Sequence, residues 1–131
     1  TTQVRRLLAS PRATETLVDL VAQWLGVTEL DRTSLDPKAF PQFTPALRAS
    51  MRAETAAFVR HVLANRGARL RDLLRAPETV ADAAIAGLYG TSLVVGKPMS
   101  LDPARRSGVL TQPSVLTVTH GAVLRGKTVR M

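Results

Sequence analysis

The sequence contains no cysteine, few aromatic residues (4%) and no long uninterrupted apolar run. Without cysteine, these residues can form no disulfide, no thiolate metal site and no Cys-x-x-Cys-His attachment of c-type haem. Because no apolar stretch approaches the ~20 residues of a spanning helix, we expect no membrane-spanning segment. A phosphate-binding glycine loop, a nucleophile elbow and a paired-histidine zinc helix are also missing, so no reaction and no catalytic residue is assigned.

The positive charge is the most unusual feature of the composition. The chain has 131 residues, 45% of them hydrophobic, and a net charge of +8. Six basic residues and one acidic residue lie after Gly90, so the excess belongs to the C-terminal tail. All aromatic residues lie outside that tail, which argues against a stacking platform for single strands. Nucleic-acid binding is therefore the least favoured function for this basic chain.

Two helix starts can be read directly from the sequence. Ser10 before Pro11, and Thr44 before Pro45, both match an N-cap followed by proline at the first helical position. They predict helices from residue 11 to about 25 and from 45 to about 64. Shorter helices are expected within 1–10, before Pro77 and before Gly90, with a connecting loop over 27–43.

Apolar residues at helical spacing predict which faces are buried. The two predicted stripes are Leu17, Leu20, Val21, Trp24 and Leu25, and Leu47, Met51, Phe58, Val62 and Leu63. Trp24 is therefore interpreted as a core residue, and Phe40 and Phe43 of the loop are expected to pack back onto the helices. Glu54 is assigned to the solvated face. His61 lies beside a stripe without a second histidine nearby, which favours a packed or surface residue over a ligand.

After Gly90 the sequence becomes rich in β-branched residues and hydroxyls. The runs "SLVVGKPMSL" and "SVLTVTH" are typical of strands and predict a small two-stranded ribbon. We therefore expect a mainly α fold: a helical, bundle-like domain over 1–90, with a basic β or extended tail over 91–131 packed on it. The hydroxyls near His120 are interpreted as ordinary strand residues, because a catalytic triad also needs a positioned acid and an oxyanion hole.

Several segments carry a family resemblance that spans nearly the whole chain. They are "QVRRLLASPRA", "QWLGVTELDRTSLDPKAFPQFTPALRASMRAET", "GLYGTSL", "RRSGVLTQPSVLTVT" and "VLRGKTVR". Together they resemble two adjoining domains of unknown function from large secreted proteins of planctomycetes and myxobacteria, the planctomycete-cytochrome-associated domains. The tail pattern Arg-x-Gly-Val/Leu-Leu-Thr-Gln is the more specific part, because it is long and ordered.

The resemblance implies a periplasmic or secreted protein in which c-type haem is attached to a segment outside this chain. Such domains usually precede a Cys-x-x-Cys-His segment. Only His120, Gly121 and Ala122 separate "LTVT" from "VLRGK", where the family typically has a longer polar loop. We therefore expect residues to be missing around His120 or beyond Met131.

From these observations the chain is expected to support electron transfer or a redox reaction by packing against the haem-bearing segment of the same protein. The candidate interface residues are Arg106, Gln112, Arg125 and Lys127. No cofactor-binding or metal-ligating residue is expected within the chain itself. Two alternatives stay open: a structural or interaction domain without a redox role, whose arginines bind backbone carbonyls or Asp102, and a basic nucleic-acid-binding domain.

Overall fold

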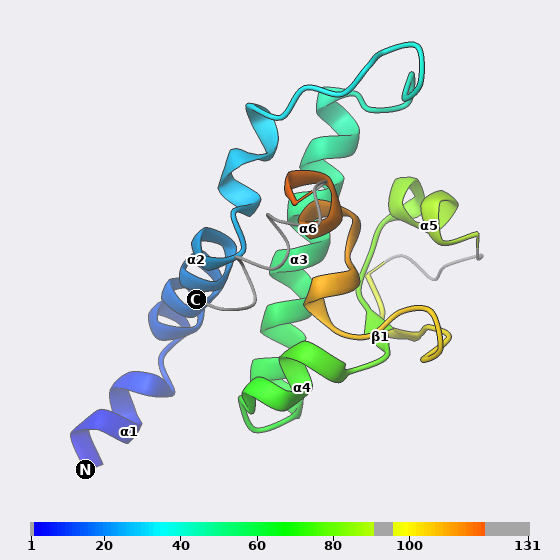
Figure 1. The fold of residues 1–131 in the computed structure, drawn as a ribbon. Coiled ribbons are helices and arrows are strands. Elements are labelled where there is room, and N and C mark those ends of the chain that lie inside the picture. Colours follow the sequence, from blue (N-terminus) through cyan, green and yellow to red (C-terminus); the bar gives the residue numbers. More distant parts are fainter. Residues whose placement is uncertain (1, 91–95, 120–131) are drawn as a thin grey trace.

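The computed structural model describes residues 2–90 and 96–119, and these residues form a mainly helical fold (Figure 1). The prediction of a mainly α fold is confirmed. The α-helices are α1 (Thr2–Leu8), α2 (Pro11–Trp24), α3 (Pro45–Asn65), α4 (Leu70–Arg75), α5 (Ala83–Tyr89) and α6 (Pro113–Val118). Two 3-10 helices, η1 (Val27–Asp31) and η2 (Val109–Thr111), and two strands, β1 (Glu78–Thr79) and β2 (Met99–Ser100), complete it.

The two long helices begin where the sequence predicts. Ser10 Oγ accepts a hydrogen bond from the Ala13 amide (3.2 Å), and Thr44 Oγ1 accepts one from the Leu47 amide (3.2 Å). Each bond satisfies an amide that the first helical turn leaves without a partner. In the described part of the chain, no helix combines the length and the hydrophobicity that crossing a membrane requires.

The main apolar cluster joins both halves of the sequence. Helix α3 lies at the centre, and α2 packs along it (Figure 1). The buried members are Val18, Leu25, Val27, Phe58, Val59, Val62, Leu73, Ala76, Val109 and Val115. A second cluster contains Leu30, Leu47, Met51, Ala81 and Ile85, with Phe43, Tyr89 and Val118 packed against it. Residues after 90 therefore supply side chains to both clusters.

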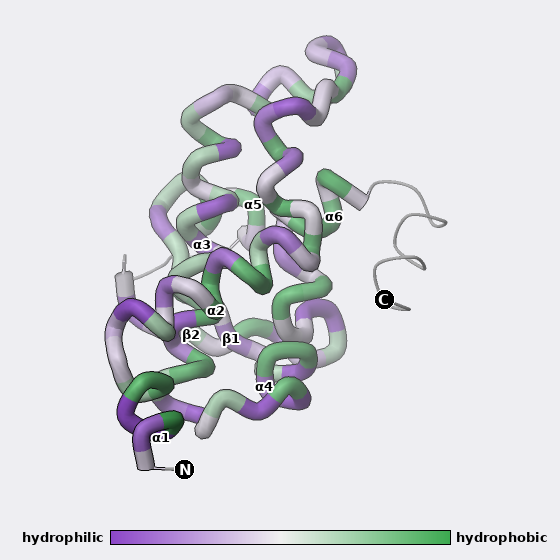
Figure 2. Tube along the Cα trace, turned by 90° about the vertical axis from the view of Figure 1, so that its left-hand side faces the viewer, coloured by the Kyte–Doolittle hydropathy of each residue, from purple (hydrophilic) through white to green (hydrophobic). Residues whose placement is uncertain are grey.

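Some residues of the predicted stripes are less buried than expected. Trp24 packs against the main cluster but is only half-buried, and Leu20 is 58% exposed. Phe40 is 47% exposed, so only Phe43 packs back as predicted. The loop that precedes α3 extends past the N-terminal end of that helix (Figure 1). Helix α1 also projects from the body, and it carries hydrophobic residues (Figure 2) but none that is buried.

The prediction of a strand in "SVLTVTH" is wrong over its described part. Residues 113–118 form helix α6, and strand β2 pairs in antiparallel fashion with β1, with Glu78 opposite Ser100. Tertiary packing overrides the β propensity here, because Ser114 and Val115 of α6 are buried against α3. The hydroxyls of Ser114 and Thr55 lie 2.6 Å apart and join the two helices. His120 lies outside the described residues.

The tail is fixed to the C-terminal end of α4 by a close backbone contact. Gly108 has φ +60°, and its amide donates to the Ala76 carbonyl oxygen (2.9 Å). A Cβ atom at this position would lie 2.2 Å from the carbonyl carbon of Leu74. Ser107 Oγ also donates to the Arg75 carbonyl oxygen (3.1 Å). Only glycine fits at position 108, because the positive φ disfavours other residues and the Leu74 backbone leaves no room for a Cβ atom.

Phe58 is fully buried, so its truncation tests the main cluster. We expect Phe58→Ala to lower the free energy of unfolding by about 3–5 kcal/mol, since it removes an aromatic ring and leaves a cavity. Trp24→Ala should cost less, because Trp24 is only half-buried. Urea denaturation followed by circular dichroism measures both, with exposed Phe40→Ala as the control. A loss below ~1 kcal/mol for Phe58→Ala would contradict the assigned packing.

The Gly108 crossing predicts opposite effects for two glycine-to-alanine changes. Gly108→Ala should destabilise the chain by about 1–3 kcal/mol or more, because its Cβ would overlap the Leu74 backbone. Gly87→Ala, inside α5 and with nothing within 4 Å of the new Cβ, should stabilise it by roughly 0.5–1 kcal/mol. Thermal melting compares the pair. Equal melting temperatures for the two variants would contradict the close contact between Gly108 and the Leu74 backbone.

Candidate functional site

Glu54 of α3 is the residue whose position differs most from the sequence prediction. Assigned there to the solvated face, it is only 1% exposed in the structure. It lies three residues after Met51 and four before Phe58, both buried on the same helix face. Residues at these spacings share a face of a helix, so the signal was present in the sequence. The assignment of Glu54 to the surface is therefore wrong.

The Glu54 carboxyl is held by hydroxyl groups from two other elements. Its Oε1 atom accepts hydrogen bonds from Thr79 Oγ1 of β1 (2.6 Å) and from the Tyr89 hydroxyl of α5 (2.5 Å). Its Oε2 atom is buried and has no hydrogen-bond partner in the described part of the structure. Burial raises the pKa of Glu54 above its ordinary value, although both hydrogen bonds and the charge of Arg106 act in the opposite direction.

Tyr89 connects this buried carboxyl to the surface. Burial, together with the nearby Glu54 charge, raises the pKa of the Tyr89 hydroxyl, so this group stays a hydrogen-bond donor. The guanidinium carbon of Arg106 lies 5.1 Å from the centre of the Tyr89 ring, within the range of a cation–π contact. Arg106 also donates from Nη1 to the Thr111 carbonyl oxygen (2.9 Å). The Tyr89 side chain is thus held at its hydroxyl by Glu54 and at a ring face by Arg106.

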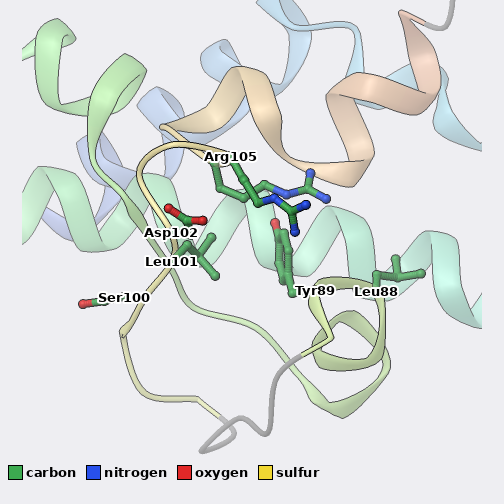
Figure 3. A pocket seen from close by; sticks show the side chains of 7 residues that line it. Leu88, Tyr89, Ser100, Leu101, Asp102 and Arg105 are labelled. Atoms are coloured by element: carbon green, nitrogen blue, oxygen red, sulfur yellow. The ribbon is translucent and has the colours of Figure 1, made fainter.

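A cleft of about 400 Å³ opens beside Tyr89 and Arg106 (Figure 3). Its walls come from the end of α5, from β2 and from the segment that follows β2. The lining residues are Leu88, Tyr89, Ser100, Leu101, Asp102, Arg105 and Arg106. Arg105 is exposed and forms no ion pair within the described ranges 2–90 and 96–119. The cleft therefore carries two guanidinium groups and one carboxylate.

The structure describes two of the four predicted interface residues. Arg106 is half-buried on the cleft wall, whereas Gln112 is 3% exposed and neither amide atom has a hydrogen-bond partner among described residues. Arg125 and Lys127 lie outside the described residues. Arg105 is not among the predicted interface residues, although it precedes Arg106 directly in the tail pattern. Nothing in that pattern distinguishes a cleft arginine from a solvated one.

His61 belongs to a separate charged cluster. Its Nε2 atom lies 3.2 Å from Glu78 Oε1, and its Nδ1 atom lies 3.2 Å from the Asn65 side-chain nitrogen. Glu78 Oε1 also accepts a hydrogen bond from Arg66 Nε (2.7 Å), and this bond is the main reason that the pKa of Glu78 is lowered. Among the described residues, no group of three or more histidine, cysteine, aspartate or glutamate side chains could hold a metal ion.

One family model matches the chain. It is the model of PSD4, described as a protein of unknown function (DUF1592), and it covers residues 1–91. The matched region contains α1 to α5, and thus Glu54, Thr79 and Tyr89, but not Arg105 or Arg106. No curated protein and no solved structure matches the chain.

The raised pKa of Glu54 predicts how stability depends on pH. The native state keeps the Glu54 proton to a higher pH than the unfolded chain, whose carboxyl titrates near 4.5. As the pH rises from 4.5 through the native pKa, the unfolded state therefore binds fewer protons, and wild-type stability falls. Glu54→Gln keeps a neutral group of the same shape. It should gain stability relative to wild type over that range, measured by urea denaturation between pH 4 and 8.

Glu78→Gln is the matched control with the opposite sign. Arg66 lowers the pKa of Glu78, so its contribution to stability is present above 4.5 and is lost as the pH falls through the native pKa. The Glu78→Gln variant should therefore lose stability relative to wild type as the pH rises towards 4.5, which urea denaturation extended below pH 4.5 measures. Wild-type and Glu54→Gln curves that stay parallel from pH 4 to 8 would contradict the buried position of the Glu54 carboxyl.

Proposed function

Since the chain belongs to the PSD4 family, whose function is unknown, we propose from the geometry of the cleft and the resemblance of the tail that it is an interaction module of a larger periplasmic or secreted cytochrome-c-like protein. In this proposal the module packs against a haem-bearing segment outside the chain and so supports electron transfer. The resemblance of the tail pattern supports the cellular context. The arginine-lined cleft supports the mode of contact.

The single observation that carries the proposal is the pair of guanidinium groups at the cleft. Arg105 is exposed and without an ion pair among described residues, and Arg106 lies beside it on the same wall. A guanidinium group offers a planar fork of donors that can bind a carboxylate with two hydrogen bonds. Asp102 lines the same cleft and would repel a carboxylate, so the acidic group would lie on the arginine side. Haem propionates and acidic side chains both have this chemistry.

The residues of this chain do not fit a covalently attached haem. The sequence contains no cysteine to form the thioether bonds. Of its two histidines, His61 faces Glu78 and Asn65, and His120 lies outside the described residues. The haem of the proposal therefore belongs to another segment, and no step of electron transfer is assigned to residues of this chain.

A second candidate function is a structural interaction domain without a redox role. The observation in its favour is that Arg106 already contacts its own domain, through the Thr111 carbonyl oxygen and the Tyr89 ring. An arginine with this role holds the tail in place and needs no partner. Arg105 has no such contacts among the described residues, so a substitution of Arg105 distinguishes the two functions.

The redox proposal predicts a change in the haem potential of the full-length protein when the cleft loses charge. Arg105→Gln, and more strongly Arg105→Gln with Arg106→Gln, should lower the reduction potential, because removing positive charge near haem disfavours its reduced form. A spectroelectrochemical titration measures this shift. Arg71→Gln, an exposed change on α4, is the control.

Two results would contradict the redox proposal. One is a full-length protein without covalently bound haem in a haem stain. The other is a double variant in which the haem reduction potential stays at its wild-type value and the haem-bearing segment is no more sensitive to protease than in wild type. The second result, combined with a lower melting temperature of the Arg106→Gln variant, would favour the structural function.

A further inference from the structure

An apolar groove adjoins the arginine-lined cleft. It has a volume of about 270 Å³ and lies between the 35–43 loop, α3, the end of α5 and α6. Its lining residues are Leu35, Phe40, Gln42, Phe43, Leu47, Met51, Leu88, Arg106, Pro113, Leu116 and Thr117. Leu88 and Arg106 line both the groove and the cleft. The two spaces therefore adjoin at these two residues, and Figure 3 shows the Leu88 side chain directed away from the Tyr89 ring.

The groove keeps large apolar side chains in contact with solvent. Phe40 is 47% exposed and Leu88 is 38% exposed, while the buried Leu47 and Met51 side chains contribute to the lining. Exposed apolar surface of this kind is unfavourable in water, and its burial by a ligand is a source of binding free energy. The volume lies just below the roughly 300–1,000 Å³ of typical ligand pockets, which limits the occupant to a small group.

The charges at the shared wall select the kind of group. Arg106 is the one charged residue in the groove lining among the described residues, and Arg105 lies on the cleft side of it. An apolar groove lined by Arg106, next to a cleft that also carries Arg105, is complementary to a carboxylate with an apolar body. A neutral apolar group would form no ion pair with the two arginines, and a cationic group would be repelled by them.

We propose that the groove and cleft together bind a carboxylate that carries a short aliphatic or aromatic body. The carboxylate lies at Arg105 and Arg106, and the body lies in the groove against Phe40 and Leu88. The inference rests on the proposed function, since it names the chemistry that the docking segment presents: an acidic group attached to an apolar one. Because Arg106 is already held by Thr111 and Tyr89, one of the two cations is fixed in place before binding.

Calorimetric titration of the 131-residue chain with octanoate tests the chemistry without the haem-bearing segment. We expect saturable one-to-one binding of octanoate, and binding of 1-octanol and octylammonium that is at least tenfold weaker. Arg105→Gln and Phe40→Ser should each weaken octanoate binding severalfold or more. The matched controls Arg71→Gln and Leu70→Ser, exposed changes on α4, should leave it unchanged.

Arg105→Gln is preferred to Arg106→Gln, because Arg106 also contacts its own domain and its loss affects folding. Equal affinity for octanoate and 1-octanol would overturn the role of the arginines. Undiminished octanoate binding by Phe40→Ser would overturn the role of the groove, and no octanoate binding at all would overturn the inference. Failure of the proposed function gives a different result, because octanoate would bind while the haem potential of the full-length Arg105→Gln variant stays unchanged.

Discussion

The hydrogen-bonded burial of the Glu54 carboxyl is the interaction on which the arrangement around the cleft depends. It joins α3, which carries Glu54, to β1 through Thr79 and to α5 through Tyr89. Taking a carboxylate out of water is costly, and two short hydrogen bonds on one oxygen only partly offset that cost. The raised pKa is the consequence, since the neutral carboxyl is the less costly form to bury. Tyr89 is thereby fixed, and with it the ring beneath Arg106.

The specific tail pattern "RRSGVLTQ" has a structural explanation in its own hydrogen bonds. Arg106 Nη1 donates to the Thr111 carbonyl oxygen, and the Ser107 amide donates to Thr111 Oγ1. Thr111 Oγ1 in turn donates to the Gly108 carbonyl oxygen (3.1 Å), so the loop closes on itself. Val109 is fully buried in the main cluster and anchors the loop to the body. Within this pattern, Arg106, Ser107, Gly108, Val109 and Thr111 each have a specific bond or contact.

Local signals in the sequence were sufficient for the helices but not for the tail or the site. The N-caps Ser10 and Thr44 act within one turn, so they could be predicted without the fold. The strand prediction over 114–120 failed over its described residues because β-branched residues also suit a short buried helix once α3 lies against them. The site needed more than local information. Spacing could have placed Glu54 on the buried face of α3, but its partners Thr79 and Tyr89 are 25 and 35 residues away.

In the proposed site the two cleft arginines have different roles, because only Arg106 is held by contacts with its own domain. Arg106 is held by a backbone carbonyl and an aromatic ring, so little of its freedom remains to be lost when a ligand binds. Arg105 has no comparable contact in the described residues, and its ordering would be a cost of binding. A ligand that meets only Arg105 would find one flexible cation on an open surface, where ion pairs contribute little. In the proposed binding mode the ligand therefore has to reach Arg106 as well. Since Arg106 also lines the apolar groove, such a group gains from carrying apolar surface next to its charge.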